Sequence, residues 1–186
     1  VIFSQDEIYQ KHGYAMHEAL KSADYKVEFI TLPNGEEAKS FPAIQKALAN
    51  ILKVNGDRFS TFLALGGGVV GDVTGFLAAI FMRGVDYIQI PTSLLAMVDS
   101  SIGGKTGINI SEGKNLVGAF WQPKAVIIDP EVLITLPKRE LTSAMGEIIK
   151  YGAILDKELA YLMSDNMDDL LDSNDYSLLL DIIIRC

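Results

Sequence analysis

Before residue 136, short apolar runs alternate with longer amphipathic stretches along the chain. The apolar runs predict strands at 1–3, 25–32, 61–65, 87–90 and 125–128. The amphipathic stretches predict helices at 6–22, 40–52 and 72–82, and Ser40 is a favourable N-cap for the second of these. Strands that alternate with helices indicate an α/β fold with a parallel sheet and helices on its faces.

The pattern changes after Leu136-Pro137, because only helical periodicities remain from Arg139 to Cys186. Most of the net negative charge lies in this last segment and is typical of a solvated helix face. We therefore predict two domains, an α/β domain over 1–135 and the beginning of an all-α domain over 136–186.

Composition excludes several classes of protein. The chain has 186 residues, 49% of them hydrophobic, which argues against disorder, and its 24 acidic against 16 basic residues argue against a nucleic-acid partner. No apolar run reaches the roughly 18 to 20 residues of a membrane span, so no membrane partner is expected. One cysteine and no visible secretory leader suit a cytoplasmic protein. A start without Met and an end after an apolar run suggest a piece of a longer protein.

Residues 66–71, Gly-Gly-Gly-Val-Val-Gly, satisfy the G-x-G-x-x-G pattern between a predicted strand and a predicted helix. Glycines let backbone N–H groups approach a pyrophosphate, which the helix N-terminus also attracts. The acidic residue that usually ends the next strand, about 20 residues further on, is missing, because Asp86 begins that strand. The pattern therefore indicates either a variant dinucleotide site or a tight strand-to-helix turn.

Residues 99–115 combine several glycines with Asp99, Lys105, Lys114 and Asn115. This composition suits a phosphorylated or polyhydroxylated ligand, although a glycine-rich loop with solvent-facing lysines would share it. The segment is not a Walker A loop, since the first glycine of that motif is not at the required offset.

Glu147 and Lys150 share one face of a predicted helix at i, i+3 spacing. They form either a surface ion pair or a metal-binding carboxylate beside a substrate-holding cation. A catalytic zinc site needs more ligands than Glu147. His12 and His17 are far upstream, and we interpret both as surface or core residues.

Together, five segments resemble the 3-dehydroquinate synthases, members of the sugar-phosphate cyclases. They are residues 65–72 (LGGGVVGD), 83–85 (RGV), 91–107 (PTSLLAMVDSSIGGKTG), 113–120 (GKNLVGAF) and 136–152 (LPKREL through GEIIKYG). The resemblance covers essentially the whole chain and is most specific between residues 65 and 152. It implies a Rossmann-like NAD-binding domain followed by the start of a helical metal- and substrate-binding domain.

The resemblance also implies a reaction. The family is a carbon–oxygen lyase that uses NAD and Zn²⁺ (or Co²⁺) to convert 3-deoxy-D-arabino-heptulosonate 7-phosphate, a small phosphorylated sugar acid, into 3-dehydroquinate and phosphate in the shikimate pathway. Transient oxidation by NAD acidifies a neighbouring C–H bond, and this allows phosphate to leave. A homodimer is expected as well.

When the family's functional residues are carried over onto the matching motifs, the resemblance implies catalytic roles for Arg83, Asp99, Lys105, Asn115 and Lys150. It also implies a metal-binding role for Glu147. Cofactor contacts are implied for Asn34, Gly35, Glu36, Glu37, Ala38, Lys39, Gly67, Gly68, Val69, Val70, Gly71, Asp72, Thr92, Ser93, Lys105, Lys114, Val132, Leu133, Ile134 and Thr135. Gln5 and Asp6 stand where the family usually has Asp or Asn near the cofactor ribose. Two zinc-binding histidines would lie beyond Cys186, so we expect the 186-residue chain alone to be inactive.

Two other functions stay open. A cyclase of the valiolone or inosose type, or a glycerol-dehydrogenase-like oxidoreductase, would share the glycine motif, although the runs 104–109 and 147–152 favour the synthase. A non-catalytic binding module is the third possibility, and the retention of every charged substrate position from Arg83 to Lys150 argues against it.

Overall fold

The computed structural model describes residues 1–172 and 176–186. Within them, five parallel strands form a sheet in the order β2-β1-β3-β4-β7. The strands are β1 (Ile2–Ser4), β2 (Phe29–Thr31), β3 (Phe62–Gly66), β4 (Tyr87–Pro91) and β7 (Ala125–Val126). The predicted α/β class and parallel sheet are confirmed, although β2 and β7 are shorter than the apolar runs that predicted them.

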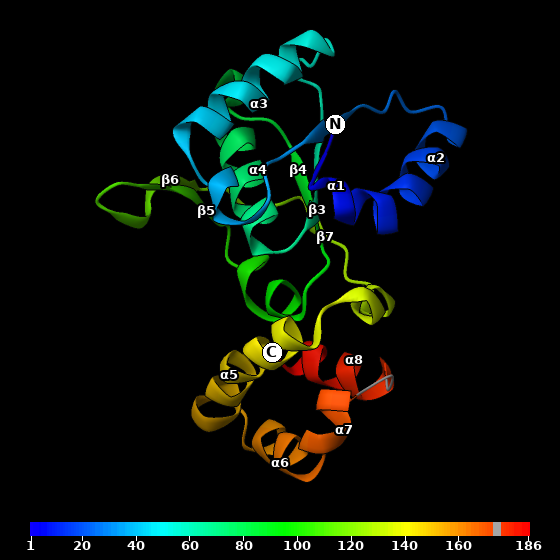
Figure 1. The fold of residues 1–186 in the computed structure, drawn as a ribbon, viewed down its shortest axis with the longest axis vertical. Helices are drawn as coiled ribbons and strands as arrows, with labels where there is room; N and C mark the ends of the chain where they lie inside the picture. The colour runs from blue at the N-terminus through cyan, green and yellow to red at the C-terminus, as the bar shows by residue number, and fades with distance from the viewer. Residues whose placement is uncertain (173–175) are drawn as a thin grey trace.

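Helices cover both faces of this sheet (Figure 1). On one side lie α3 (Phe41–Lys53) and α4 (Gly68–Ile80), and Ser40 caps α3 as predicted, with its Oγ 3.4 Å from the Ala43 N–H. On the other side α1 (Asp6–Ile8), the π-helical turn η1 (Tyr9–Gly13) and α2 (Tyr14–Ser22) follow one another without a break. The helix predicted over 6–22 is therefore present, with a wider turn in its middle.

Helix α4 begins at Gly68, four residues before the predicted start at residue 72. The last residues of the glycine motif are therefore the first turn of a helix instead of a loop. The prediction began too late because glycine and valine have low helix propensity. The 3₁₀ turn η3 (Phe81–Arg83) follows, and Met82 and Arg83 have the left-handed φ values 48° and 70°.

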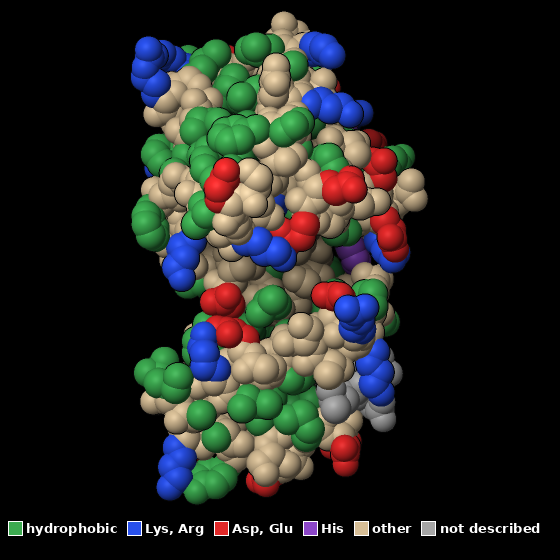
Figure 2. Space-filling view, turned by 60° about the vertical axis from the view of Figure 1, so that its left-hand side comes forward, with side chains coloured by type: hydrophobic (Ala, Val, Ile, Leu, Met, Phe, Trp, Pro, Cys, Tyr) green, Lys and Arg blue, Asp and Glu red, His purple; other side chains and the backbone are tan. Residues whose placement is uncertain are grey.

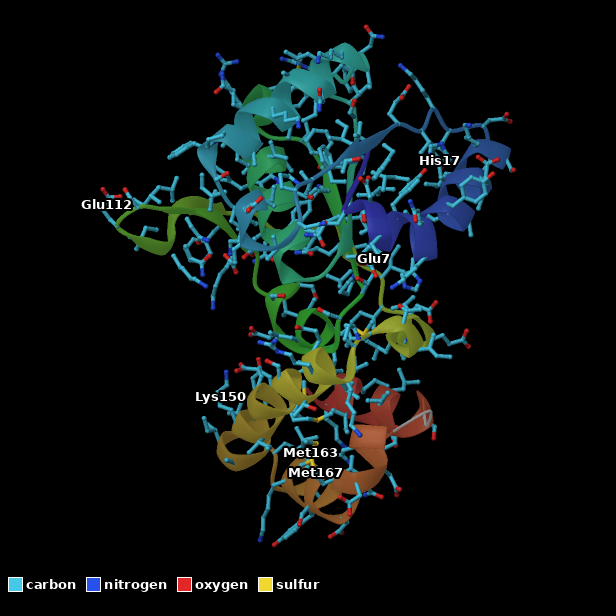
Figure 3. The ribbon with its side chains drawn as sticks, in the orientation of Figure 1. Glu7, His17, Glu112, Lys150, Met163 and Met167 are labelled. Atoms are coloured by element: carbon cyan, nitrogen blue, oxygen red, sulfur yellow. The ribbon has the colours of Figure 1, made fainter. Side chains whose placement is uncertain are left out.

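Residues 99–115, for which a glycine-rich loop was the alternative interpretation, are not a single loop. The π-helical turn η4 (Ala96–Ser100) ends just inside this segment, and an antiparallel hairpin follows, formed by β5 (Lys105–Ile110) and β6 (Gly113–Phe120). The hairpin extends away from the sheet, with Glu112 at its tip (Figure 3). Its glycines hid the strand pattern but are needed there, because a Cβ atom on Gly118 would lie 2.0 Å from the Thr106 carbonyl oxygen.

The described residues from 130 on are mainly helical, as predicted for 139–186, while residues 173–175 of that prediction lie outside the described residues. They form the 3₁₀ helix η5 (Pro130–Thr135) and the helices α5 (Lys138–Ile154), α6 (Lys157–Asp165), α7 (Met167–Asp172) and α8 (Tyr176–Arg185). In Figure 1 helices α5 to α8 form a separate lower lobe.

Two apolar cores hold these parts together. The first lies between the sheet and helices α3 and α4 and contains Phe3, Phe62 and Leu77. The second joins helices α5 to α8 to Leu94 and Met97, which precede the hairpin. The segment 94–98 is therefore packed against the helical lobe, and this packing fixes the position of the residues that follow the segment. None of the helices described is long and apolar enough to cross a membrane.

Candidate functional site

A cleft of about 750 Å³ lies at the carboxyl ends of the strands. Its wall includes Gln5 after β1, Gly67 after β3 and Thr92 after β4. Loops at this edge of a parallel sheet commonly bind ligands, and the volume is in the range of small-molecule sites. Figure 2 shows a groove between the upper part of the molecule and the helical lobe, with charged side chains along its edges.

The glycine motif forms the middle of this cleft. Gly67 is the N-cap of α4, and Gly68 is its first residue. The first N–H groups of an α-helix have no acceptor within the helix, so this turn offers donors and a partial positive charge to an anion. A Cβ atom on Gly68 would come within 2.8 Å of the Ser100 Oγ, so a larger residue here would force Ser100 to shift. The cleft therefore fits a pyrophosphate at this turn.

Twelve of the predicted cofactor contacts line the cleft: Asn34, Gly35, Glu36, Lys39, Gly67, Gly68, Val69, Val70, Asp72, Thr92, Ser93 and Thr135. The structure does not bring the side chains of the others to its wall. Ala38 and Leu133 are buried in the two cores, and Ile134 is 68% exposed. Lys114 lies on the hairpin and forms an exposed ion pair with Glu36 at 4.0 Å. Glu37, Gly71 and Val132 are also outside the cleft wall, and Lys105 lines a second pocket.

That second pocket, of about 530 Å³, lies beside the hairpin. It brings together Asp99, Lys105 and Asn115, three of the predicted catalytic residues. Asp72 and Ser100 line both the cleft and the pocket, so the two spaces adjoin. The cleft and the pocket therefore share part of their walls.

A buried lysine, Lys39, contacts residues that line both the cleft and the pocket. The Nζ of Lys39 lies 2.6 Å from Asp72 Oδ2 and 2.5 Å from Asn115 Oδ1, and the side chain is 5% exposed. Asn115 has a left-handed φ of 58°, a conformation that asparagine tolerates better than most residues. Burial raises the pKa of Asp72 above its ordinary value, while the hydrogen bond and charge of Lys39 oppose that rise.

Three further predicted residues lie outside both spaces. Arg83 is exposed in η3. Glu147 forms an ion pair with Lys150, which Figure 3 labels on α5, and this agrees with the simpler of the two sequence interpretations. The neighbouring Tyr151 reaches back to the pocket, where its hydroxyl donates to Asp99 Oδ1 at 3.2 Å. Burial and the nearby Asp99 raise the pKa of Tyr151 to about 12, so this donor stays protonated at neutral pH.

No catalytic metal site is complete in the described residues. They contain no group of three His, Cys, Asp or Glu side chains that could hold a metal ion. A catalytic zinc site uses three protein ligands and an open position. Glu147 alone therefore does not fit such a site.

Sequence reasoning missed two residues. His12, interpreted as a surface or core residue, lines the cleft, and its Nε2 lies 2.7 Å from the Thr135 Oγ1. His17 is half-buried against the Tyr9 hydroxyl and does not line the cleft. Tyr151 was seen as part of a motif but not as a partner of Asp99. The signal available for His12 was its place after the first strand, since segments at that edge of a parallel sheet face the ligand.

Comparison with known proteins decides the family. The sequence model of the family described as 3-dehydroquinate synthase N-terminal matches residues 29–143. The chain belongs to the 3-dehydroquinate synthase family. A curated 3-dehydroquinate synthase from Prochlorococcus marinus subsp. pastoris is 50% identical over 181 residues, which cover 96% of this chain and 50% of the relative. The chain thus spans about half the length of the curated relatives it matches.

Solved structures of related cyclases share the fold. The 2-epi-5-epi-valiolone synthase ValA from Streptomyces hygroscopicus, with NAD⁺ and Zn²⁺ bound, matches with a TM-score of 0.93 at 28% identity, over 99% of this chain and 52% of that one. A 2-deoxy-scyllo-inosose synthase complexed with carbaglucose-6-phosphate, NAD⁺ and Co²⁺ matches with a TM-score of 0.75 at 28% identity, over 80% of this chain and 40% of that one. The 3-dehydroquinate synthases are therefore more similar in sequence than these two cyclases.

Proposed function

We propose that this chain supplies the NAD-binding half and part of the substrate pocket of a 3-dehydroquinate synthase. The observation that carries the proposal is the junction of the two spaces at Asp72 and Ser100. A hydride acceptor in the cleft and an alcohol in the pocket would meet there. The roughly 50% identity to curated synthases supports this reaction over those of the valiolone and inosose cyclases.

The cleft residues would bind and orient NAD, which accepts a hydride from an alcohol and returns it later. The N-terminal turn of α4, from Gly68 to Val70, would hold the pyrophosphate. Thr92 and Ser93 would contact the cofactor near the end of β4, and the segment 34–39 would close the opposite wall. The nicotinamide ring, which carries the hydride, would lie at the Ser100 end of the cleft. Within the described residues, only this end of the cleft adjoins the pocket.

The pocket residues would hold a phosphorylated sugar acid. The Lys105 ammonium would pair with its phosphate or carboxylate, and Asn115, held by Lys39, would bind a hydroxyl. Asp99 has Oδ1 committed to Tyr151, so Oδ2 is available to accept from a substrate hydroxyl. Lys150 is proposed as a second cation on the α5 side, where it would first leave its ion pair with Glu147.

Glu147 stays a predicted ligand for Zn²⁺ or Co²⁺. The described residues form no complete metal site with it. A cytoplasmic location also stays a prediction.

The test is an assay of the complete gene product that contains these 186 residues. With NAD and the heptulosonate phosphate, we expect stoichiometric release of 3-dehydroquinate and phosphate. Sedoheptulose 7-phosphate and glycerol serve as matched substrates for a valiolone-type cyclase and for a polyol dehydrogenase. Turnover of either one, with none of the heptulosonate, would contradict the proposal.

We also propose a homodimer in which Arg83 acts on the partner's substrate. Arg83 is exposed, lines neither space of its own subunit, and is held in a left-handed conformation of the kind that functional sites retain. Heterodimers of an Arg83→Ala subunit and a Lys150→Ala subunit should recover activity that either homodimer lacks. Verified heterodimers as inactive as both parents would refute action in trans.

A further inference from the structure

We propose that His12 is a cofactor-binding residue that contacts the adenosine half of NAD. The inference rests on the proposed function, since it takes the cleft as the NAD site. His12 lies in η1, far along the sequence from the glycine motif at 66–71 and from the segment 99–115. It still lines the same cleft as Gly67 and Gly68.

A hydrogen bond fixes the orientation of the His12 ring. Its Nε2 lies 2.7 Å from Thr135 Oγ1, while that hydroxyl lies 3.0 Å from the Val132 carbonyl oxygen. A carbonyl can only accept, so the single hydroxyl proton of Thr135 is committed to Val132. Thr135 must therefore accept from His12, and Nε2 carries the proton.

The other ring nitrogen is then left for a ligand. Burial, assisted by the nearby Lys11, lowers the pKa of His12 below its ordinary value, so the ring is neutral at pH 7. In a neutral ring with Nε2 protonated, Nδ1 is an acceptor. Among the described residues, Nδ1 has no hydrogen-bond partner, so it can accept from a hydroxyl or amino group.

The position of His12 selects the adenosine half. The end of the cleft that adjoins the substrate pocket, at Asp72 and Ser100, must take the nicotinamide. The turn at Gly68 takes the pyrophosphate between the two halves. His12 and Thr135 come from η1 and η5, and neither element contributes to the substrate pocket. Ribose hydroxyls and the adenine amino group are the donors that this end would receive.

The experiment measures binding of NAD, ADP and nicotinamide mononucleotide to the complete gene product by calorimetry. His12→Phe keeps a ring but removes both nitrogens, and we expect it to weaken NAD and ADP about fivefold, the size of one hydrogen bond. Nicotinamide mononucleotide should bind unchanged. His12→Gln keeps an N–H for Thr135 and an oxygen for the ligand, so it should restore most of the affinity.

The matched control is His17→Phe, which changes the other histidine of the same helical segment outside the cleft. It should leave ADP affinity unchanged, and thermal unfolding checks that each variant is folded. Equal ADP binding by the wild type and His12→Phe would overturn the inference, as would equal losses for His12→Phe and His17→Phe or an equal loss for nicotinamide mononucleotide. If the wild type bound neither NAD nor ADP, the proposed function would fail first and this inference with it.

Discussion

Removal of the Lys39 ammonium tests whether the buried contact between cleft and pocket stabilises the fold. Lys39→Met keeps most of the side-chain stem but leaves Asp72 and Asn115 without their shared donor. Loss of one partner of a buried ion pair costs about 3 to 5 kcal/mol. Asp72 is 21% exposed and keeps some contact with water, so we expect a loss near the lower limit, about 3 kcal/mol.

The chain contains a matched exposed pair. Lys11 and Glu7 have the same 2.6 Å separation as Lys39 and Asp72, but their side chains are 42% and 77% exposed. Lys11→Met should therefore leave the free energy of unfolding almost unchanged, because water screens an exposed ion pair. Urea unfolding of both variants, followed by circular dichroism, measures the two free energies. Equal losses would refute the argument that burial gives the Lys39 contact its strength.

The pH dependence of Lys39→Met gives a second measurement. Burial raises the pKa of Asp72 above its ordinary value of 3.8. In Lys39→Met the hydrogen bond and the positive charge that oppose this rise are both lost. The native state then binds more protons than the unfolded state above pH 3.8, so the free energy of unfolding falls as pH rises through that window. The deficit of Lys39→Met relative to the wild type should therefore be smaller at pH 5 than at pH 7. A deficit that grows toward low pH would contradict this.

Two other substitutions test the cofactor and substrate sites. Gly68→Val should weaken NAD binding at least tenfold, about 1.4 kcal/mol, because its side chain would enter the space beside Ser100. The control Gly146→Val should leave NAD binding unchanged, since a Cβ atom on Gly146 meets nothing within 4 Å. Unchanged affinity in a folded Gly68→Val protein by calorimetry would defeat the pyrophosphate assignment. Tyr151→Phe should lower kcat/KM about fivefold, because the hydrogen bond to Asp99 is lost, and should leave the NAD dissociation constant unchanged. An unchanged steady-state kcat/KM would show that other contacts hold Asp99.

Much of the fold was predictable because its signals are local. Buried parallel strands appear as short apolar runs, and Ser40 marks the beginning of α3 through a hydrogen bond within three residues. The hairpin was not predictable in this way. Gly107 and Gly118 carry no side chain to show alternation, and the hairpin needs them because the two backbones approach too closely for a Cβ.

The site was predictable where a motif carries it within one segment. The glycine turn lines the cleft, and Asp99, Ser100, Ile102 and Lys105 line the adjoining pocket, while their roles stay predictions. The same motif reasoning assigned cofactor contacts to Leu133 and Ile134, whose side chains face a core and the solvent. A motif fixes which segment is near a ligand, whereas the burial of each side chain depends on packing against distant helices.

Three contacts at the cleft and the pocket depend on pairs of residues far apart in the chain. Lys39 and Asn115 are separated by 76 positions, Asp99 and Tyr151 by 52, and His12 and Thr135 by 123. Periodicity is read in windows of about 11 to 18 residues, so no such window contains both partners of any pair. Each pair also joins different elements, so its geometry exists only once the sheet, the hairpin and the helical lobe have packed. Polar residues that line a site without belonging to its motif are therefore found from the fold, as His12 was.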